Sequence, residues 1–408
     1  MIISLPPEIP WRLLMNETKK ALLGGVVLLE SGEMKDCGVL VEEDRIGRLL
    51  PEGETAPAGY ERIDCSGKIV APGLIDTHVH GACGRNFMEG TAEAIHEISE
   101  FLIRGGTTSC LGTTTSVKVD DEEKALRCLR AASRNPVKGQ VEILGSHLEG
   151  PFINPKNRGA HMEGHIRCAS KEELERIAEA AGDSLKIVTL APEMDYAGEA
   201  IEFFKNQGVR VSIGHTQADY GQTQAALQAG AGRGTHLFNA MPSIHHREPG
   251  PVVALLNCPG VYLEMTADGK HLAPAIMEMV LKVAGTERCI LITDGVDARG
   301  RGDGTFQRWE GTTVTVQNGE ARTKTGSLAG SMLSLSDAVR NMVNLTHIPL
   351  SAAIRMASEN PARSIGVFDR KGSISQGKDG DFVILNDDLS VYMTIVRGEI
   401  VYKGEKQR

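Results

Sequence analysis

The sequence predicts a TIM-type (β/α)8 barrel joined to a small β-sandwich domain built from both ends of the chain. Three observations predict this fold: apolar runs alternate with helix-like stretches in the middle, strand-like segments fill both ends, and 46 glycines supply tight turns. Strand and helix that alternate eight times are the pattern of a closed parallel barrel.

The barrel is expected to extend from about residue 71 to residue 371. Helix-like stretches such as TAEAIHEISEFLIRGG and SKEELERIAEAAG separate its short apolar runs. The eight runs lie near IVAPGLIDTHVH, TTSCLGTTTS, VEILGSHLEG, LKIVTLAPE, VRVSIGHTQ, GRGTHLFNA, VYLEMTADG and CILITDG. Barrel enzymes carry their chemistry at the C-terminal ends of the strands, so the residues that close these runs are the first candidates.

The two ends of the chain share a sequence pattern that differs from that of the middle. Segments such as ALLGGVVLLESGE near the start, and GDFVILNDDLSVYMTIVRGEIVYKG near the end, are short apolar runs broken by turn residues. We therefore expect one β-sandwich domain from residues 19–70 and 372–406, with residues 1–18 as an N-terminal extension.

Composition bounds the class of protein. The chain has 408 residues and a formal charge of −9, which argues against nucleic acid or an anionic membrane as its main partner. Its eight cysteines form no CxxC pair and read as reduced thiols. The start resembles no secretion signal and no apolar stretch reaches the roughly 18 residues of a membrane span, so we expect a cytoplasmic protein.

Metal-binding residue types close several of the apolar runs. His78 and His80 alternate with other residues on one predicted strand, so both side chains point to the same side. In a barrel, the C-terminal ends of the other strands surround the same opening, so the residues at those ends are expected to lie near His78 and His80. The residues that close the runs are Asp76, His78, His80, Glu149, His215, His236 and Asp294.

This set predicts metal-dependent hydrolysis. Histidine and carboxylate side chains are good ligands for Zn²⁺ or Fe²⁺, and an Asp beside such an ion can take a proton from the water that the ion activates. A single His at a strand end is most often an ordinary hydrogen-bonded residue, but coincidence does not explain the whole set. The histidines without this placement are taken as ordinary: His96, His165, His245, His246 and His347.

Several segments carry a resemblance to a known family. PGLIDTHVHG resembles the entry signature of the amidohydrolase superfamily. Together, HLEGPFINPKNRGAH, SIGHT, THLFNAMPSIHHREPG, TADGKH, ITDG and TGSLAGS resemble N-acetylglucosamine-6-phosphate deacetylases from about Gly67 to the C-terminus. The resemblance implies hydrolysis of the N-acetyl amide of N-acetylglucosamine 6-phosphate, which gives glucosamine 6-phosphate and acetate.

The resemblance also implies a role for each matching residue. Asp294 is the expected catalytic base and then acid, and His161 polarises the acetyl carbonyl. Glu149, His215 and His236 hold one metal ion, Zn or Fe, and His78 with His80 makes a second ion possible. Arg247 is expected to reach the site of a neighbouring subunit in a homodimer. The expected substrate-binding residues are Ala160, His161, Asn239, Ala240, Arg247, His271, Leu328, Ala329 and Gly330.

Three alternatives stay open. The same chemistry can act on N-acetylgalactosamine 6-phosphate, which differs in the orientation of one hydroxyl. Another amidohydrolase, acting on a cyclic amide or an isopeptide, would share the metal residues. Its substrate would not require the REPG and DGKH segments. A metal-binding protein that has lost catalysis would carry a defect in the set, and none is present.

Overall fold

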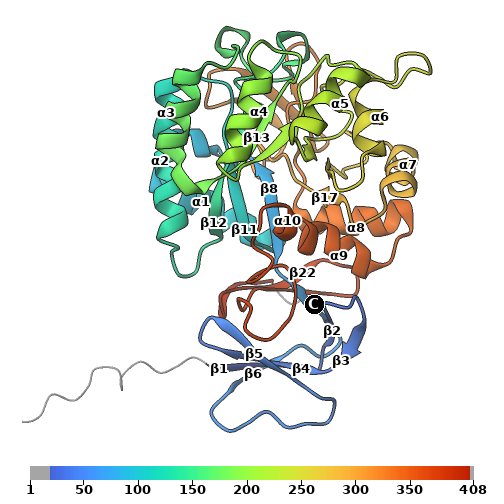
Figure 1. Cartoon of the computed structure of the whole chain (residues 1–408). Helices are drawn as coiled ribbons and strands as arrows, with labels where there is room; N and C mark the ends of the chain where they lie inside the picture. Colours follow the sequence, from blue (N-terminus) through green and yellow to red (C-terminus); the bar gives the residue numbers. More distant parts are fainter. Residues whose placement is uncertain (1–18, 405–408) are drawn as a thin grey trace, which may run out of the picture.

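The eight apolar runs form eight parallel strands in the computed structural model, which describes residues 19–404 (Figure 1). Each strand pairs with its neighbours in chain order. The first and last strands also approach each other, because Asp294 N donates to His78 O (2.9 Å) and His80 N donates to Gly295 O (2.8 Å). The predicted barrel is confirmed and nearly closed. Its strands are β8 (Leu74–Val79), β11 (Thr107–Thr113), β12 (Glu142–Glu149), β13 (Leu185–Leu190), β14 (Arg210–Ile213), β15 (Arg233–Gly234), β16 (Tyr262–Met265) and β17 (Cys289–Leu291).

A helix follows each barrel strand and packs its apolar face on the outside of the sheet. In the helix after β12, for example, Leu174 and Ile177 are buried, and the N-terminal Ser170 accepts a hydrogen bond from Glu173 N. The helices are α1 (Ala92–Leu102), α2 (Val119–Arg134), α3 (Lys171–Ala181), α4 (Ala197–Asn206), α5 (Tyr220–Ala229), α6 (Gly250–Asn257), α7 (Pro274–Ala284) and α8 (Leu335–Thr346).

Two further helices, α9 (Leu350–Ala357) and α10 (Glu359–Ser364), connect the barrel to the terminal domain. Ala362 of α10 and the following Ile365 pack against Ile75, Leu111 and other barrel residues. This apolar cluster fills the barrel near the start of its strands, so the functional site can only lie toward the other end.

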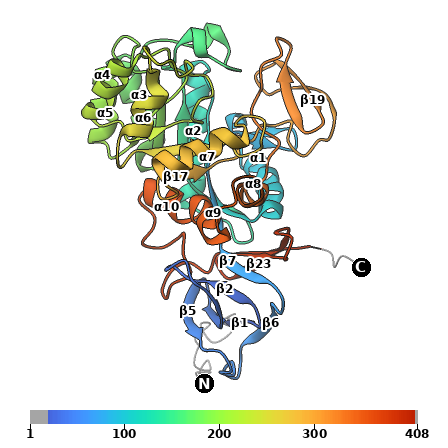
Figure 2. The same ribbon diagram turned by 90° about the vertical axis from the view of Figure 1, so that its right-hand side faces the viewer.

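Both ends of the chain form the small domain below the barrel (Figures 1 and 2). One sheet has the order β5-β4-β1-β6 and the other β23-β22-β21-β7-β2-β3. Val39 and Val41 of the first sheet share a core with Val27, Phe382 and Ile395 of the second, which is a sandwich. The strands are β1 (Lys19–Leu23), β2 (Val26–Leu28), β3 (Met34–Asp36), β4 (Gly38–Glu42), β5 (Arg45–Leu50), β6 (Glu61–Asp64), β7 (Ile69–Pro72), β21 (Phe382–Leu385), β22 (Val391–Val396) and β23 (Glu399–Lys403).

A three-stranded sheet between β17 and α8 was not predicted. It consists of β18 (Gly304–Gln307), β19 (Thr313–Gln317) and β20 (Glu320–Thr323), and Figure 2 shows it beside the barrel. The signal was present, because Asn318 and Gly319 both have positive φ angles and join two alternating segments as a tight hairpin turn. A short β9–β10 hairpin (Gly81–Ala82, Arg85–Asn86) follows β8.

The predicted N-terminal extension, residues 1–18, lies outside the described residues. Within residues 19–404, none of the helices combines the length and the apolar character needed to cross a membrane.

Candidate active site

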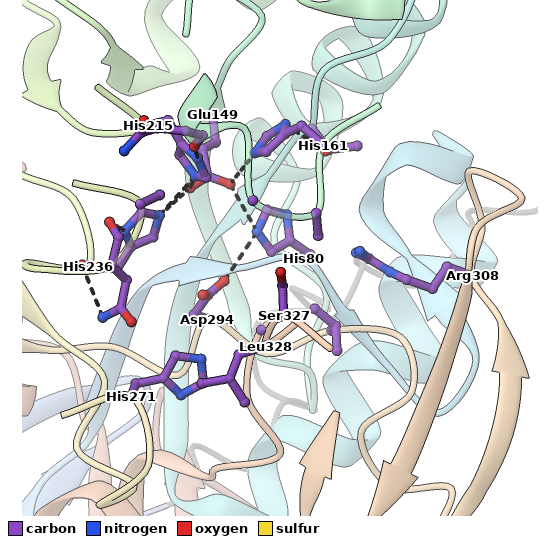
Figure 3. A pocket seen from close by; sticks show the side chains of 18 of the residues that line it. His80, Glu149, His161, His215, His236, His271, Asp294, Arg308, Ser327 and Leu328 are labelled. Atoms are coloured by element: carbon purple, nitrogen blue, oxygen red, sulfur yellow. Dashed lines mark hydrogen bonds and ion pairs between the residues drawn. The ribbon is translucent and has the colours of Figure 1, made fainter. Parts of the chain in front are cut away.

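The C-terminal ends of the barrel strands surround a pocket of about 390 Å³ (Figure 3). Strand, loop and inserted sheet all contribute to its walls, so residues more than 200 positions apart in the sequence face the same space. The lining residues are His80, Thr115, Glu149, Lys156, Asn157, Gly159, Ala160, His161, His215, His236, Asn239, Ala240, His271, Asp294, Val296, Arg308, Ser327, Leu328 and Gly330.

Several of these residues hold an unusual backbone conformation. His215, His236, Ala240 and Asp294 have φ angles of 48°, 28°, 54° and 48°. Non-glycine residues rarely adopt the left-handed region, and doing so costs on the order of 1–3 kcal/mol. Such residues gather at functional sites, where the turn aims the side chain into the pocket at the expense of local stability.

Glu149, the last residue of β12, is the centre of the site. Its Oε1 lies 3.2 Å from His78 Nε2, 3.3 Å from His215 Nε2 and 3.1 Å from His236 Nε2. Its Oε2 lies 3.2 Å from His80 Nε2 and 3.4 Å from His161 Nε2. Burial opposes ionisation of this carboxyl, but the charge of His78 and the contacts with His161, His215 and His236 outweigh burial and hold its pKa well below the usual range.

Asp294 faces the same cluster from the end of β17. Its Oδ1 lies 3.4 Å from His80 Nε2 and 3.6 Å from His78 Nε2. Burial would raise the pKa of Asp294, but the neighbouring His78 and His80 lower it to about 2. Burial likewise disfavours protonated His80, yet its hydrogen bonds to Asp294 and Glu149 raise its pKa to about 9. At neutral pH Asp294 is therefore a carboxylate that can accept a proton.

His215 and His236 are oriented by backbone carbonyls. His215 Nδ1 donates to Asn157 O (2.7 Å), and His236 Nδ1 donates to Asn239 O (3.2 Å). In each ring Nε2 is then the nitrogen that faces the cluster, and it offers a lone pair to a metal ion when it carries no proton. The two Nε2 atoms are only 3.0 Å apart. Two ring nitrogens this close repel each other unless a cation, either a metal ion or a proton, lies between them.

His161 has the opposite orientation. Its Nδ1 accepts a hydrogen bond from Ser116 N (3.1 Å), so the neutral ring carries its proton on Nε2. Burial is the main reason that the pKa of His161 falls to about 4, so the ring is neutral at pH 7. His161 therefore presents an N–H donor to the pocket, whereas His215 and His236 present lone pairs.

Polar groups at the other side of the pocket come from the loops after β15 and β16. His271 Nδ1 donates to Asp268 Oδ2 (2.7 Å), which fixes the ring with Nε2 free. Asn239 and Ala240 follow His236 in the same loop and line the pocket. Leu328 and Gly330 enter from the segment after β20, and Ser331 N donates to Asp294 O (2.8 Å).

Three expected site residues lie elsewhere. Arg247 is exposed in the loop between β15 and α6, and it does not line the pocket of its own chain. Ala329 packs behind the wall in an apolar cluster with Val296 and Val314. His78 is fully buried beneath the pocket floor, where its Nε2 still reaches Glu149.

Sequence reasoning missed two groups of residues. The first is Arg308, which reaches the pocket from the turn after β18 (Figure 3) and pairs with Glu310 at 2.9 Å. A lone arginine in an unassigned segment gave no signal. The second is a buried polar layer beneath the floor, with Arg233 and Glu264 at its centre. A charged residue inside the apolar run VYLEM was a signal that could have found it.

Residues 69–401 match the model of the amidohydrolase family, and the chain belongs to this family. It is 37% identical to N-acetylglucosamine-6-phosphate deacetylase of Bacillus subtilis, over 92% of this chain and 95% of that protein. It is also 37% identical to N-acetylgalactosamine-6-phosphate deacetylase of Escherichia coli O157:H7, over 92% of this chain and 97% of that protein.

The fold agrees with a solved relative. The structure of a mutant N-acetyl-D-glucosamine-6-phosphate deacetylase from Mycobacterium smegmatis, in complex with N-acetyl-D-glucosamine-6-phosphate, superposes with a TM-score of 0.88. The two sequences are 34% identical, and the match covers 95% of this chain and all of the other.

Proposed function

We propose that this protein hydrolyses the N-acetyl amide of N-acetylglucosamine 6-phosphate to glucosamine 6-phosphate and acetate. The observation that carries the proposal is the convergence of Glu149, Asp294 and five histidines on one pocket, in a chain that matches deacetylases over 92% of its length. A protein that had lost catalysis would lack one of these groups, and all are in place.

The residues present fit a divalent metal ion. The lone pairs of His215 and His236 meet at 3.0 Å, and His78 Nε2 is buried and makes no hydrogen bond within residues 19–404. Nitrogen and carboxylate donors in this arrangement favour Zn²⁺ or Fe²⁺ over Mg²⁺ or Ca²⁺. Such an ion would lower the pKa of a water molecule and polarise the carbonyl to be attacked.

We assign the ligands by the orientation of each ring. Glu149, His215 and His236 would hold the first ion, because their free lone pairs share one space. His78 and His80 would hold a second ion, because their Nε2 atoms lie 3.2 Å from Glu149 Oε1 and Oε2 respectively. The ion would replace the proton that His80 Nε2 shares with Asp294 and Glu149. His161 is excluded as a ligand because its Nε2 carries a proton.

The same reasoning assigns the proton-handling groups. Asp294 is ionised and can take a proton from the attacking water, then deliver it to the departing amine nitrogen. His161 stays neutral and can donate its Nε2–H to the acetyl oxygen as negative charge develops there. Thr115 and Ser116 hold the ring in the orientation that this donation requires.

The sugar phosphate would occupy the remainder of the pocket. We propose that Asn239, Ala240 and His271 bind the phosphate end, and that Ala160, Leu328 and Gly330 line the sugar. Ala329 would support that wall from behind. In a homodimer, Arg247 of a second copy would add the guanidinium that matches a phosphate geometrically.

N-acetylgalactosamine 6-phosphate is the second candidate substrate. The E. coli relative named for that substrate is as similar as the B. subtilis relative, at 37% identity. The two sugars differ at one hydroxyl, so the same metal and proton-handling residues serve both.

Acetate release from a panel of N-acetylhexosamines, each with and without the 6-phosphate, tests the proposal. We expect the highest kcat/KM for N-acetylglucosamine 6-phosphate and loss of turnover after removal of metal by a chelator. A higher value for the galactosamine epimer would select the second candidate. Full activity without metal, or activity only on cyclic amides or dipeptides, would overturn the proposal.

A further inference from the structure

The barrel interior beneath the pocket contains a fully buried ion pair. Glu264 of β16 and Arg233 of β15 have no exposed surface. Arg233 Nε donates to Glu264 Oε1 at 3.0 Å, and Arg233 Nη2 lies 2.9 Å from the same oxygen. Removing two charges from water is costly, and a well-packed apolar pair of similar volume is often at least as stable. Stability alone therefore does not explain why these two charged residues are buried together. Their contacts with the site residues indicate a different role.

The second oxygen of Glu264 joins two parts of the site. Glu264 Oε2 accepts hydrogen bonds from His78 Nδ1 (2.9 Å) and from His236 N (3.0 Å). With Arg233 on the other oxygen, four donors surround the carboxylate, so Glu264 is not itself free to bind a metal ion. The hydrogen bond to His78 forces the proton of that ring onto Nδ1 and leaves the Nε2 lone pair facing Glu149 and Asp294.

His147 lies in the same layer but cannot complete a metal site there. Its Nδ1 and Nε2 are both engaged, by Thr77 O (3.1 Å) and Thr189 Oγ1 (2.8 Å). The guanidinium of Arg233 beside Glu264 also repels a cation. The layer therefore supports the site above it and is not a third ion site.

We propose that Glu264, held in place by Arg233, is the positioning residue that makes His78 a ligand of the second metal ion. This inference rests on the proposed metal-dependent function. A carboxylate that accepts the outer N–H of a ligating histidine fixes the orientation of the ring and increases its basicity. Loss of such a partner typically weakens metal binding by ~10–100-fold. The protein's ability to hold two ions thus depends on a pair of residues outside the pocket.

Zn²⁺ titration of the chelator-treated full-length protein, followed by competition with a chromophoric chelator, tests this proposal. Wild type should bind two ions per chain in separable steps. Glu264→Gln should weaken the second step by ~10–100-fold and the first step clearly less, because Glu264 contacts the first site only through the backbone N of His236. In a His78→Asn background, which lacks the second step, Glu264→Gln should change nothing further, because the two residues act together.

Two variants control for a purely structural effect. Ser364→Ala removes the contact of Arg233 Nη1 (2.6 Å) without touching Glu264 or His78, so both steps should match wild type. If Glu264→Gln does not fold, Glu264→Asp keeps the charge for Arg233 but withdraws the oxygen from His78, and it should show the same selective loss.

The outcomes separate this proposal from the proposed function. An unchanged second step in folded Glu264→Gln or Glu264→Asp, or an equal loss of both steps, would overturn the role of Glu264. Binding of one ion by an active wild-type deacetylase would also overturn it and leave the function intact. Failure to bind any ion, with full activity, would overturn the function itself.

Discussion

Asp294 is the proposed proton carrier of the site. Its carboxylate is ionised, faces both His78 and His80, and follows the last barrel strand. We expect Asp294→Asn to lower kcat by a factor on the order of 10² to 10⁴, because the amide cannot take the proton of the attacking water. Steady-state kinetics with metal analysis and circular dichroism would check this. A folded, metal-loaded variant with near-normal kcat at every pH would exclude Asp294 as the proton carrier.

Gly330 supports Asp294 from the neighbouring segment. Its φ is +67°, and a Cβ at this position would lie 2.4 Å from Val296 Cγ1 and 2.6 Å from Asp294 O. Gly330→Ala should therefore displace the Asp294 backbone and lower kcat by about tenfold or more, since small misplacements at a reacting group are costly.

Gly326 offers a matched control for this substitution. It lies in the same segment with φ +88°, but no atom lies within 4 Å of its Cβ position. Both alanines incur the cost of the left-handed backbone, and only the one at Gly330 meets neighbouring atoms. Equal kcat values for the two variants would show that the close approach to Asp294 has no catalytic consequence.

Helix α2 carries a carboxyl group that is not part of the pocket. Glu122 is fully buried, and within residues 19–404 neither of its oxygens makes a hydrogen bond. Burial raises its pKa to about 8, although Thr114 and Arg167 act in the opposite direction. The unfolded pKa is about 4.3, so the stability tied to the protonated form is complete below that pH and is lost as pH rises toward 8.

Glu122→Gln should remove this pH dependence. We expect the variant to match wild type near pH 4 and to melt on the order of a few °C above it at pH 8. Asp121→Asn, an exposed neighbour on the same helix, removes the same charge and should show no such trend. Melting curves at several pH values would check this, and parallel curves for Glu122→Gln and wild type would contradict it.

The sequence predicted the elements whose apolar residues recur at regular spacing and whose ends are marked by a polar residue. Most barrel strands are apolar runs, although β15 is only Arg233 and Gly234, and the metal-type residues stand at or just beyond the strand ends, so topology alone brings Glu149, His215 and Asp294 together. Glu264 was not found, because a residue inside a strand shows its partners only when the barrel has closed. The division at about residues 70 and 371 stays a prediction, as do the roles of the individual site residues.

The overall assembly decides whether one chain holds a complete site. Arg247 is exposed in the loop from β15 to α6, which projects from the barrel (Figure 1), so it cannot serve its own pocket in this conformation. If Arg247 reaches the pocket of a second copy, Arg247→Ala should raise KM for the phosphorylated substrate by tenfold or more. An Arg–phosphate contact formed equally in ground and transition states leaves kcat and the unphosphorylated substrate almost unchanged.

Mixed dimers separate action on a neighbouring copy from action within one chain. Arg247→Ala subunits keep Asp294, and Asp294→Asn subunits keep Arg247, so a heterodimer contains one pocket with both groups only if Arg247 crosses the interface. Co-expressed and purified heterodimers, assayed at substrate concentrations well below KM, should then recover about half of the wild-type kcat/KM, since one of two sites is complete. Recovery no greater than the average of the two parent homodimers would contradict the crossing of Arg247. An equal KM increase for phosphorylated and unphosphorylated sugars would instead show that the loop maintains the assembly and does not bind phosphate.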